Sequence, residues 1–189
     1  MEQKRIFLSS PTMNGHEIEF IHDAFQKNWV APLGENGDEF EKTLAAYVGS
    51  GHALALSAGT AAIHLALKCA GVGKGDIVFC TDWTFAATCN PITYQNAVPV
   101  FIDSEAESWN MDPGALEEAF AKYPQAKAVV VANLYGTPAK LDELVRICDA
   151  HHVPLIEDAA ESLGSRYKGK QTGTFGKYGI YSFNGNKII

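Results

Sequence analysis

The chain has 189 residues, a length that suits one domain of ordinary size with room for a sizeable core. Hydrophobic residues make up 47% and charged residues 20%, which is typical of a soluble globular protein. The formal net charge is -7 and no Lys/Arg block occurs, so neither nucleic acid nor an anionic membrane is expected as the main partner.

Residues 1–6 lack the apolar core of a signal peptide, and no window of the sequence approaches a membrane span. The four cysteines have no CxxC spacing and lie in apolar stretches, so we expect reduced core residues. They are Cys69, Cys80, Cys89 and Cys148. The six histidines form no pattern typical of a metal site. The sequence therefore predicts a cytoplasmic protein without a bound metal.

Two N-terminal helices are expected, because apolar residues recur there at helical spacing. The first covers about residues 14–27 and the second residues 35–48, with a turn-rich segment between them. Ile18, Ile21 and Phe25 recur at helical spacing in the first helix, which is expected to be amphipathic, and Phe40, Leu44 and Tyr47 are expected to face inward in the second. We interpret residues 1–51 as a helical arm that packs on an α/β domain formed by residues 52–189.

From residue 52 onward, short apolar strands alternate with helices. We expect strands at 53–56, 76–80, 98–102, 128–132, 153–156 and 178–183. We expect helices at 61–70 and 86–94, one opened by Asp112-Pro113, and one at 141–151. This alternation predicts an α/β fold with a mostly parallel central sheet and helices on both faces. The domain is expected to continue beyond residue 189.

Two polar groups follow buried strands in the last third of the chain. Glu157 and Asp158 end the apolar run 153–156, and Lys187 ends the polar turn after the run 178–183. A carboxylate at a strand end lies at the crevice where open α/β sheets bind ligands. An acid and a lysine there are the two groups that pyridoxal phosphate (PLP) chemistry needs. The alternative is that Asp158 caps a short helix begun by Ala159.

A third candidate feature is the small-residue turn Ser57 to Ala62, which joins a strand to a helix. Small residues let the backbone approach a ligand, and a helix N-terminus offers free N–H groups to an anion such as phosphate. Thr60 and Ser182 add hydroxyl donors, and Phe85 could lie flat on a ring. An ordinary tight turn and a core aromatic remain the alternatives.

With these residues assembled, the chain resembles the DegT-like family of fold-type I PLP-dependent nucleotide-sugar aminotransferases. Its most specific parts are Glu157-Asp-Ala-Ala-Glu161 and Ser182-Phe-Asn-Gly-Asn-Lys187. The resemblance implies that residues 52–189 are the N-terminal part of a PLP-binding large domain. It also implies a smaller C-terminal domain beyond this sequence and a homodimer with shared active sites.

The resemblance further implies a role for each matching position. Lys187 would bind the cofactor covalently and move a proton, and Asp158 would pair with the pyridine nitrogen. Glu161 falls beside the phenolic oxygen of the ring, where many members carry glutamine or histidine. The remaining cofactor-binding positions would be Gly59, Thr60, Ala61, Phe85, Ser182 and Asn184, and the substrate-binding positions Trp29, Pro32 and Asn186.

One subgroup of this family is most similar in the entry segment 8–11, in residues 29–34 and in residues 184–187. Members of that subgroup aminate C4 of UDP-4-keto-6-deoxy-GlcNAc with glutamate as donor. A departure is Asn133, where a histidine is common. A sugar dehydratase of the same fold is a rival, but it carries histidine in place of Lys187. A cofactor-free regulatory relative is the rival from another class.

Overall fold

The computed structural model describes residues 5–7 and 9–188. Most of the N-terminal stretch tested above for a signal peptide, and Leu8 of the entry segment, lie outside the described residues. The chain divides into two compact units. One unit runs up to Ala55 and includes the residues from Phe183 onward, and the other is Leu56–Ser182. The predicted boundary at residue 51 stays a prediction.

The first unit carries the two expected helices, α1 (Glu17–Gln26) and α2 (Glu35–Val48). Helix α2 begins and ends at the predicted residues and stops at Gly49, whose left-handed φ of 75° suits a glycine. The expected inward orientation was wrong for Phe40 and Tyr47, which are 38% and 60% exposed, whereas Leu44 is half-buried. Helix α1 buries no residue, and its Phe25 is 70% exposed. Amphipathic spacing shows which face is apolar but not what covers it.

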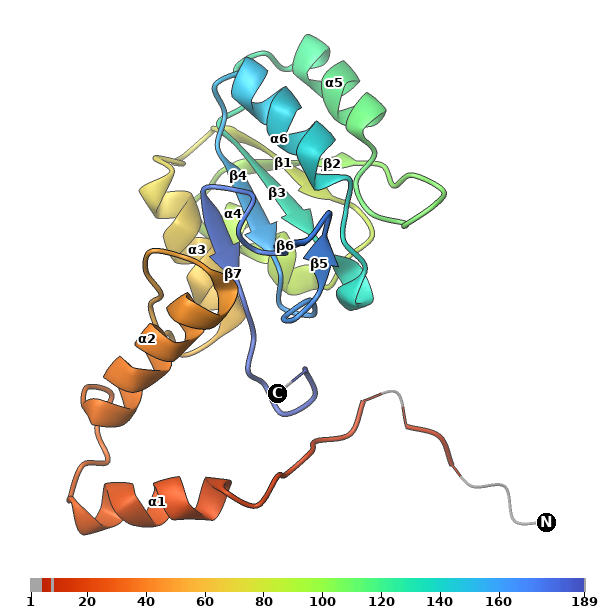
Figure 1. The fold of residues 1–189 in the computed structure, drawn as a ribbon. Helices are drawn as coiled ribbons and strands as arrows, with labels where there is room; N and C mark the ends of the chain where they lie inside the picture. The colour runs from red at the N-terminus through yellow and green to blue at the C-terminus, as the bar shows by residue number, and fades with distance from the viewer. Residues whose placement is uncertain (1–4, 8, 189) are drawn as a thin grey trace. The chain divides into compact units, whose positions relative to one another are not determined.

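The second unit contains a five-stranded, all-parallel sheet in the order β2-β1-β3-β4-β7 (Figure 1). Its strands are β1 (Ile77–Thr81), β2 (Val98–Ile102), β3 (Ala128–Ala132), β4 (Leu155–Asp158) and β7 (Tyr178–Ile180). The chain adds β2 on one side of β1 and then returns to add β3 on the other. The strand order therefore reverses between β1 and β3, which is where open α/β sheets bind ligands.

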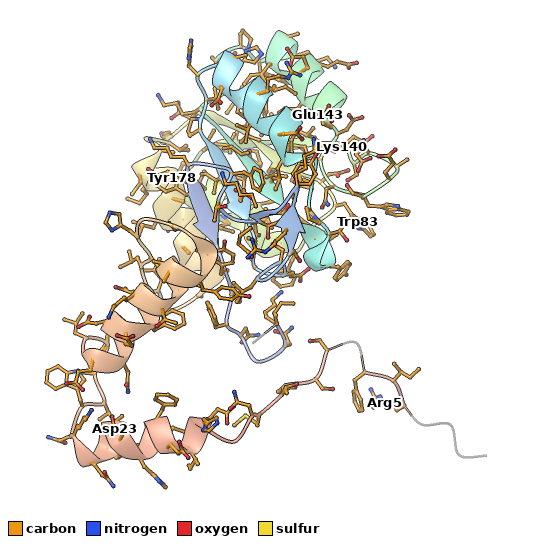
Figure 2. All side chains as sticks on the ribbon, in the orientation of Figure 1. Arg5, Asp23, Trp83, Lys140, Glu143 and Tyr178 are labelled. Atoms are coloured by element: carbon orange, nitrogen blue, oxygen red, sulfur yellow. The ribbon has the colours of Figure 1, made fainter. Side chains whose placement is uncertain are left out.

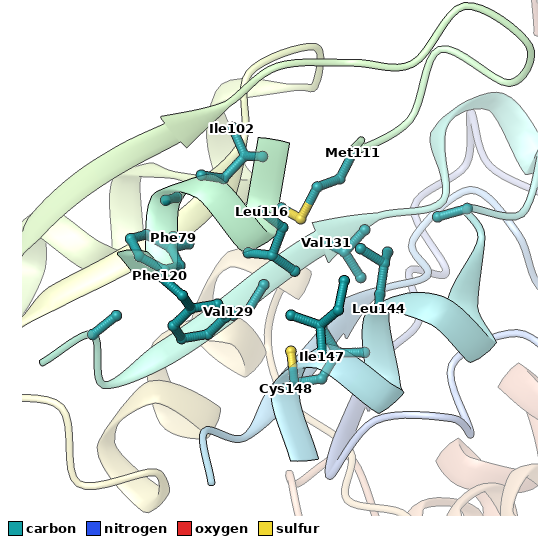
Figure 3. Packing of buried hydrophobic residues seen from close by; sticks show 14 of the residues in the cluster. Phe79, Ile102, Met111, Leu116, Phe120, Val129, Val131, Leu144, Ile147 and Cys148 are labelled. Carbon is teal, nitrogen blue, oxygen red and sulfur yellow. The ribbon is translucent and has the colours of Figure 1, made fainter. Parts of the chain in front are cut away.

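Helices cover both faces of this sheet, as predicted. The helices and short turns are α3 (Gly59–Cys69), η1 (Ala86–Thr88), α4 (Asn90–Tyr94), α5 (Pro113–Lys122), η2 (Leu134–Gly136) and α6 (Leu141–Ala150). Helices α5 and α6 pack on one face, where Phe79 meets Phe120 edge to face at 4.9 Å (Figure 3). Helices α3 and α4 pack on the other face, over Val78, Val130 and Ile156.

Side chains alternate between the two faces along each strand. In β4, Leu155 belongs to the α5/α6 face and Ile156 to the α3/α4 face. The strand continues through the two acids, which are both buried, so they do not interrupt it as expected. Glu157 therefore lies on the α5/α6 face and Asp158 on the α3/α4 face.

Three further expectations differ from the structure. Residues 53–56 form no strand, and Leu54 is 64% exposed. The helix predicted at 86–94 is divided into η1 and α4, because Pro91 begins a new helical turn. Cys80 and Cys148 are buried, but Cys69 is exposed at the end of α3.

A two-residue antiparallel pair, β5 (Arg166–Tyr167) with β6 (Lys170–Gln171), connects β4 to β7. Its Tyr167 hydroxyl and Lys168 ammonium both donate to Asp142 at the start of α6, at 2.6 Å each.

Among the described residues, no helix is long and apolar enough to cross a membrane.

Candidate active site

Asp158 is the last residue of β4 and is 9% exposed. Its Oδ2 accepts a hydrogen bond from the Thr88 hydroxyl at 2.6 Å, and its Oδ1 accepts from the Ala160 N–H at 3.2 Å. The expected alternative, a helix capped by Asp158, is not formed, since the residues after it make a turn. The carboxylate is thus held at the carboxyl edge of the sheet by a hydroxyl from η1.

A second hydroxyl extends this contact. The oxygens of Thr84 and Thr88 are 2.7 Å apart. Because the Thr88 proton is directed at the carboxylate, Thr84 must be the donor in that pair. The two hydroxyls form a short relay from the loop after β1 to Asp158. Neither threonine was singled out from the sequence, because the contact that gives the relay its purpose, between Thr88 and Asp158, spans 70 residues and leaves no local signal.

Phe85 lies next to this relay, as the residue that precedes η1. Its side chain is 70% exposed, so a core role, one of the alternatives above, does not apply. Trp83, also in this loop, is labelled in Figure 2 and is 51% exposed. Its ring centroid lies 6.0 Å from that of Trp109. The loop after β1 therefore presents aromatic surface at the same sheet edge as Asp158.

The N-terminus of α3 lies beside the end of β7. A methyl group placed on Gly59 would lie 3.7 Å from Cγ2 of Ile180 and 4.0 Å from Cβ of Ser182. The N-cap residue is Ala58, whose side chain cannot accept a hydrogen bond from the first turn. The first-turn N–H groups of Gly59, Thr60 and Ala61 thus have no side-chain cap, and the Ser182 side chain begins close to Gly59. This arrangement fits an anion such as phosphate.

Glu161 is half-buried in the turn after Asp158. Its Oε2 accepts the N–H of Tyr135 at 2.9 Å, which holds Tyr135 in a left-handed conformation with φ of 51°. Non-glycine residues adopt this conformation rarely, and they do so mostly where the surroundings fix it. Glu161 therefore anchors the loop after β3, whatever else it contacts.

Asn133, the departure from the family pattern, is buried and bridges two segments. Its Nδ2 donates to Glu157 at 3.4 Å, and its Oδ1 accepts the Ala139 N–H at 3.0 Å. It follows β3 on the α5/α6 face, on the side of the sheet opposite Asp158. The structure gives it an architectural contact at this position.

Lys187 belongs to the other unit, with the residues from Phe183 onward. Its N–H donates to the Asn184 carbonyl at 2.8 Å, which closes a turn. Within that turn the Asn184 side-chain amide donates to the Asn186 side chain, and Ser9 donates to the Asn186 carbonyl. The predicted residues Gly59, Thr60, Ala61, Phe85, Asp158, Glu161 and Ser182 lie in the unit of the sheet.

The predicted substrate-binding residues also lie in the first unit. Trp29 is 53% exposed, and its indole N–H donates to the Leu33 carbonyl. Pro32 and Asn186 are exposed as well.

An acid, a relay of hydroxyls and an uncapped helix N-terminus lie at the carboxyl edge of a parallel sheet. This arrangement defines an α/β domain with polar groups at the edge where such sheets bind ligands. The particular family follows from the sequence match. Residues 11–189 match the DegT/DnrJ/EryC1/StrS aminotransferase family, and the chain belongs to it.

Individual relatives support this assignment. The chain is 58% identical over 190 residues to a Bacillus subtilis protein named "Putative pyridoxal phosphate-dependent aminotransferase EpsN", covering 98% of this chain and 49% of the relative. It is 37% identical over 185 residues to GDP-perosamine synthase of Caulobacter vibrioides, and this match covers 98% of this chain and 49% of the relative. The chain therefore spans about half the length of the curated relatives it matches.

A solved structure agrees in fold. The structure titled "Putative sugar aminotransferase Spr1654 from Streptococcus pneumoniae, PLP-form" superposes with a TM-score of 0.91 at 28% identity. The superposition covers 97% of this chain and 50% of the other. The predicted fold class, the N-terminal part of a fold-type I large domain, is confirmed.

Proposed function

We propose that the full-length protein is a PLP-dependent aminotransferase that transfers an amino group from glutamate to a keto-sugar nucleotide. The observation that carries the proposal is Asp158, held by Thr88 at the carboxyl edge of the sheet in a chain of this family. The names of EpsN and of GDP-perosamine synthase support the reaction class. The finer proposal is amination at C4 of UDP-4-keto-6-deoxy-GlcNAc, in the cytoplasm, by a homodimer with shared active sites.

The residues of the sheet unit fit the cofactor. The first-turn N–H groups of α3 and the Ser182 hydroxyl would hold its phosphate, because a helix N-terminus favours negative charge. The exposed Phe85 ring would cover one face of the pyridine, and Asp158 would accept a hydrogen bond from the ring nitrogen. Glu161 would lie near the phenolic oxygen. Asn184, which belongs to the other unit, is proposed as a further cofactor contact.

When bound, PLP supplies an electron sink for the carbon that gains or loses the amino group. Asp158 stabilises a proton on the ring nitrogen, since an ionised carboxylate favours the neighbouring cation. Thr88 fixes the orientation of that carboxylate by donating to Oδ2. The Nζ of Lys187 would take the proton from the α-carbon of glutamate and return a proton at C4 of the sugar, as a positioned general base and acid.

The decisive experiment is borohydride reduction of the full-length protein with bound PLP, followed by peptide mass mapping. We expect the pyridoxyl mass on Lys187, and we expect Lys187→Ala to lose the visible absorbance of lysine-bound PLP together with amino transfer. A pyridoxyl mass on another lysine, or on none, would contradict the assignment. It would also reopen the dehydratase and regulatory alternatives, which need no such lysine.

A separate screen tests the substrate. Glutamate should be consumed with a UDP-linked 4-keto sugar and more slowly with GDP- or dTDP-linked 4-keto sugars. Faster turnover with a GDP-linked sugar would move the proposal toward the reaction named for the Caulobacter relative. The aminotransferase class itself would remain.

A further inference from the structure

Glu157 is fully buried, and all four of its neighbours in hydrogen-bond contact are donors. Oε1 accepts the N–H groups of Phe175 at 2.6 Å and Gly176 at 2.7 Å. Oε2 accepts the Gly173 N–H at 2.8 Å and the Asn133 amide at 3.4 Å. A protonated acid would need an acceptor for its hydrogen, so this set of donors selects the carboxylate form.

A buried charge is strongly unfavourable unless hydrogen bonds replace the lost water. Three of the four donors come from one short segment, residues 173–176, which we call the anchor turn. Gly173 has a φ of 81°, a left-handed conformation that favours glycine. The carboxylate therefore fixes the backbone of a turn whose amides would otherwise be hard to satisfy inside the protein.

The anchor turn packs directly on β7 and on the segment that follows it. A methyl group placed on Gly179 would come within 1.8 Å of the Gly173 carbonyl oxygen, so the two backbones are in contact. The Tyr181 hydroxyl donates to the Thr172 carbonyl at 2.5 Å, and its ring lies against Gly173. Residues 179–181 are thus held by the anchor turn as well as by the pairing of β7 with β4.

The next residue is Ser182, which lies beside Gly59 at the N-terminus of α3. We propose that Glu157 is a positioning residue for the cofactor phosphate: through the anchor turn and Tyr181 it sets Ser182 against the first turn of α3. The inference rests on the proposed function, because it needs a phosphate at that place. Glu157 itself lies on the opposite face of the sheet and does not touch the ligand.

The test separates positioning from general stability by removing the phosphate from the probe. Affinities of the full-length protein for PLP and for pyridoxal, which lacks the phosphate, are measured in wild type and Glu157→Gln. We expect PLP affinity to fall about 10-fold, the effect of one lost charge-assisted hydrogen bond, while pyridoxal affinity changes less than about 2-fold. Hydrogen exchange at Gly173, Phe175 and Gly176 should accelerate in the variant.

Two further variants keep the test decisive. Tyr181→Phe removes only the hydroxyl link to Thr172 and should lower the PLP-to-pyridoxal affinity ratio by a smaller factor, even if Glu157→Gln does not fold. Phe120→Leu weakens the core around Phe79 without touching the anchor turn, and it should leave the ratio unchanged.

An unchanged ratio in Tyr181→Phe and in any folded Glu157→Gln protein would overturn the positioning role alone. So would an equal loss in Phe120→Leu. A wild-type protein that binds PLP no better than pyridoxal would overturn both the positioning role and the phosphate site of the proposed function.

Discussion

Glu157 and Asp158 are neighbours in the sequence but lie on opposite faces of the sheet, in surroundings of different kinds. Glu157 accepts three backbone N–H groups of one turn and a side-chain amide. Asp158 accepts the hydroxyl of Thr88 and one backbone N–H. The first carboxylate accepts mainly from backbone donors, whereas the second accepts from a relay of two threonine hydroxyls that begins in the loop after β1.

This difference indicates how the end of one strand can carry both a residue that stabilises the fold and a residue that contacts a ligand. Alternation along β4 separates the two charges, so each can be satisfied without the other. Because Glu157 accepts hydrogen bonds from three backbone N–H groups, it holds the anchor turn in place. A hydroxyl donor instead allows Asp158 to keep its charge and to present it to a ligand. Substitutions at the two faces should therefore fail in different ways.

Asp158→Asn should have the largest effect on turnover. An amide cannot stabilise a proton on the ring nitrogen, so we expect amino transfer to fall by about 10²- to 10³-fold, the scale of a lost electrostatic contact in an active site. PLP should still bind through the phosphate site. Steady-state rates with glutamate and the keto sugar, together with a urea melt, provide the measurement. Near-normal rates would show that another group pairs with the ring nitrogen.

Gly179→Ala tests the other face by steric means. Its new Cβ would meet the Gly173 backbone oxygen at 1.8 Å, and backbone cannot rotate away as a side chain can. We expect a loss of about 2–3 kcal/mol in the free energy of unfolding, at the upper end for overpacking. Gly169→Ala, at an exposed turn with nothing within 4 Å of the new Cβ, is a steric control, although its φ of 84° adds some strain. Equal losses in the two variants would show that the contact with the anchor turn is not important.

The sequence was sufficient for the core of the fold, because strands and helices there carry strong local patterns. The runs 98–102 and 128–132 became β2 and β3 with the predicted bounds, and Asp112 caps α5 by accepting from Gly114 at 2.7 Å. The run 53–56 is equally apolar yet forms no strand. Apolar character alone does not supply a neighbouring strand, and pairing depends on the whole fold.

Residues of the candidate site were predicted where the residue type and its local position indicate the chemistry. They were missed where their role depends on contacts between distant parts of the chain. Asp158 and the small-residue turn at Gly59 could be chosen because a strand-end acid and a helix start are recognisable locally. Thr88 and the four contacts of Glu157 could not, since they join segments that are far apart in the chain. The period of two along β4 could have shown that adjacent acids face opposite ways.

Thr88→Val should affect Asp158 more weakly than removal of the carboxylate does. The change keeps the size of the side chain but removes the hydroxyl that donates to Oδ2, so turnover should fall about 10-fold. Thr88→Ser keeps the donor and should restore most of the rate. A valine variant with unchanged turnover would mean that contacts other than the Thr88 hydroxyl, such as the Ala160 N–H, orient the carboxylate.

Asp142→Asn should have the smallest effect on stability. On the α5/α6 face it compares an exposed carboxylate, that of Asp142, with the buried carboxylate of Glu157. Hydrogen bonds from the Lys168 ammonium and then from the Tyr167 hydroxyl lower the pKa of Asp142 to about 2 from its ordinary 3.8. A lowered pKa in the folded state means that the contact stabilises the protein above about pH 4 and that this contribution disappears as the pH falls toward 2.

The wild type should therefore be slightly more stable than Asp142→Asn at pH 7, and the difference should shrink steadily between about pH 4 and pH 2. Because the side chain is 47% exposed, 1 M salt should reduce the difference at pH 7 as well. Urea unfolding across this pH range measures the difference in stability between the two proteins. A difference that is independent of both pH and salt would show that packing, not charge, holds the β5–β6 pair on α6.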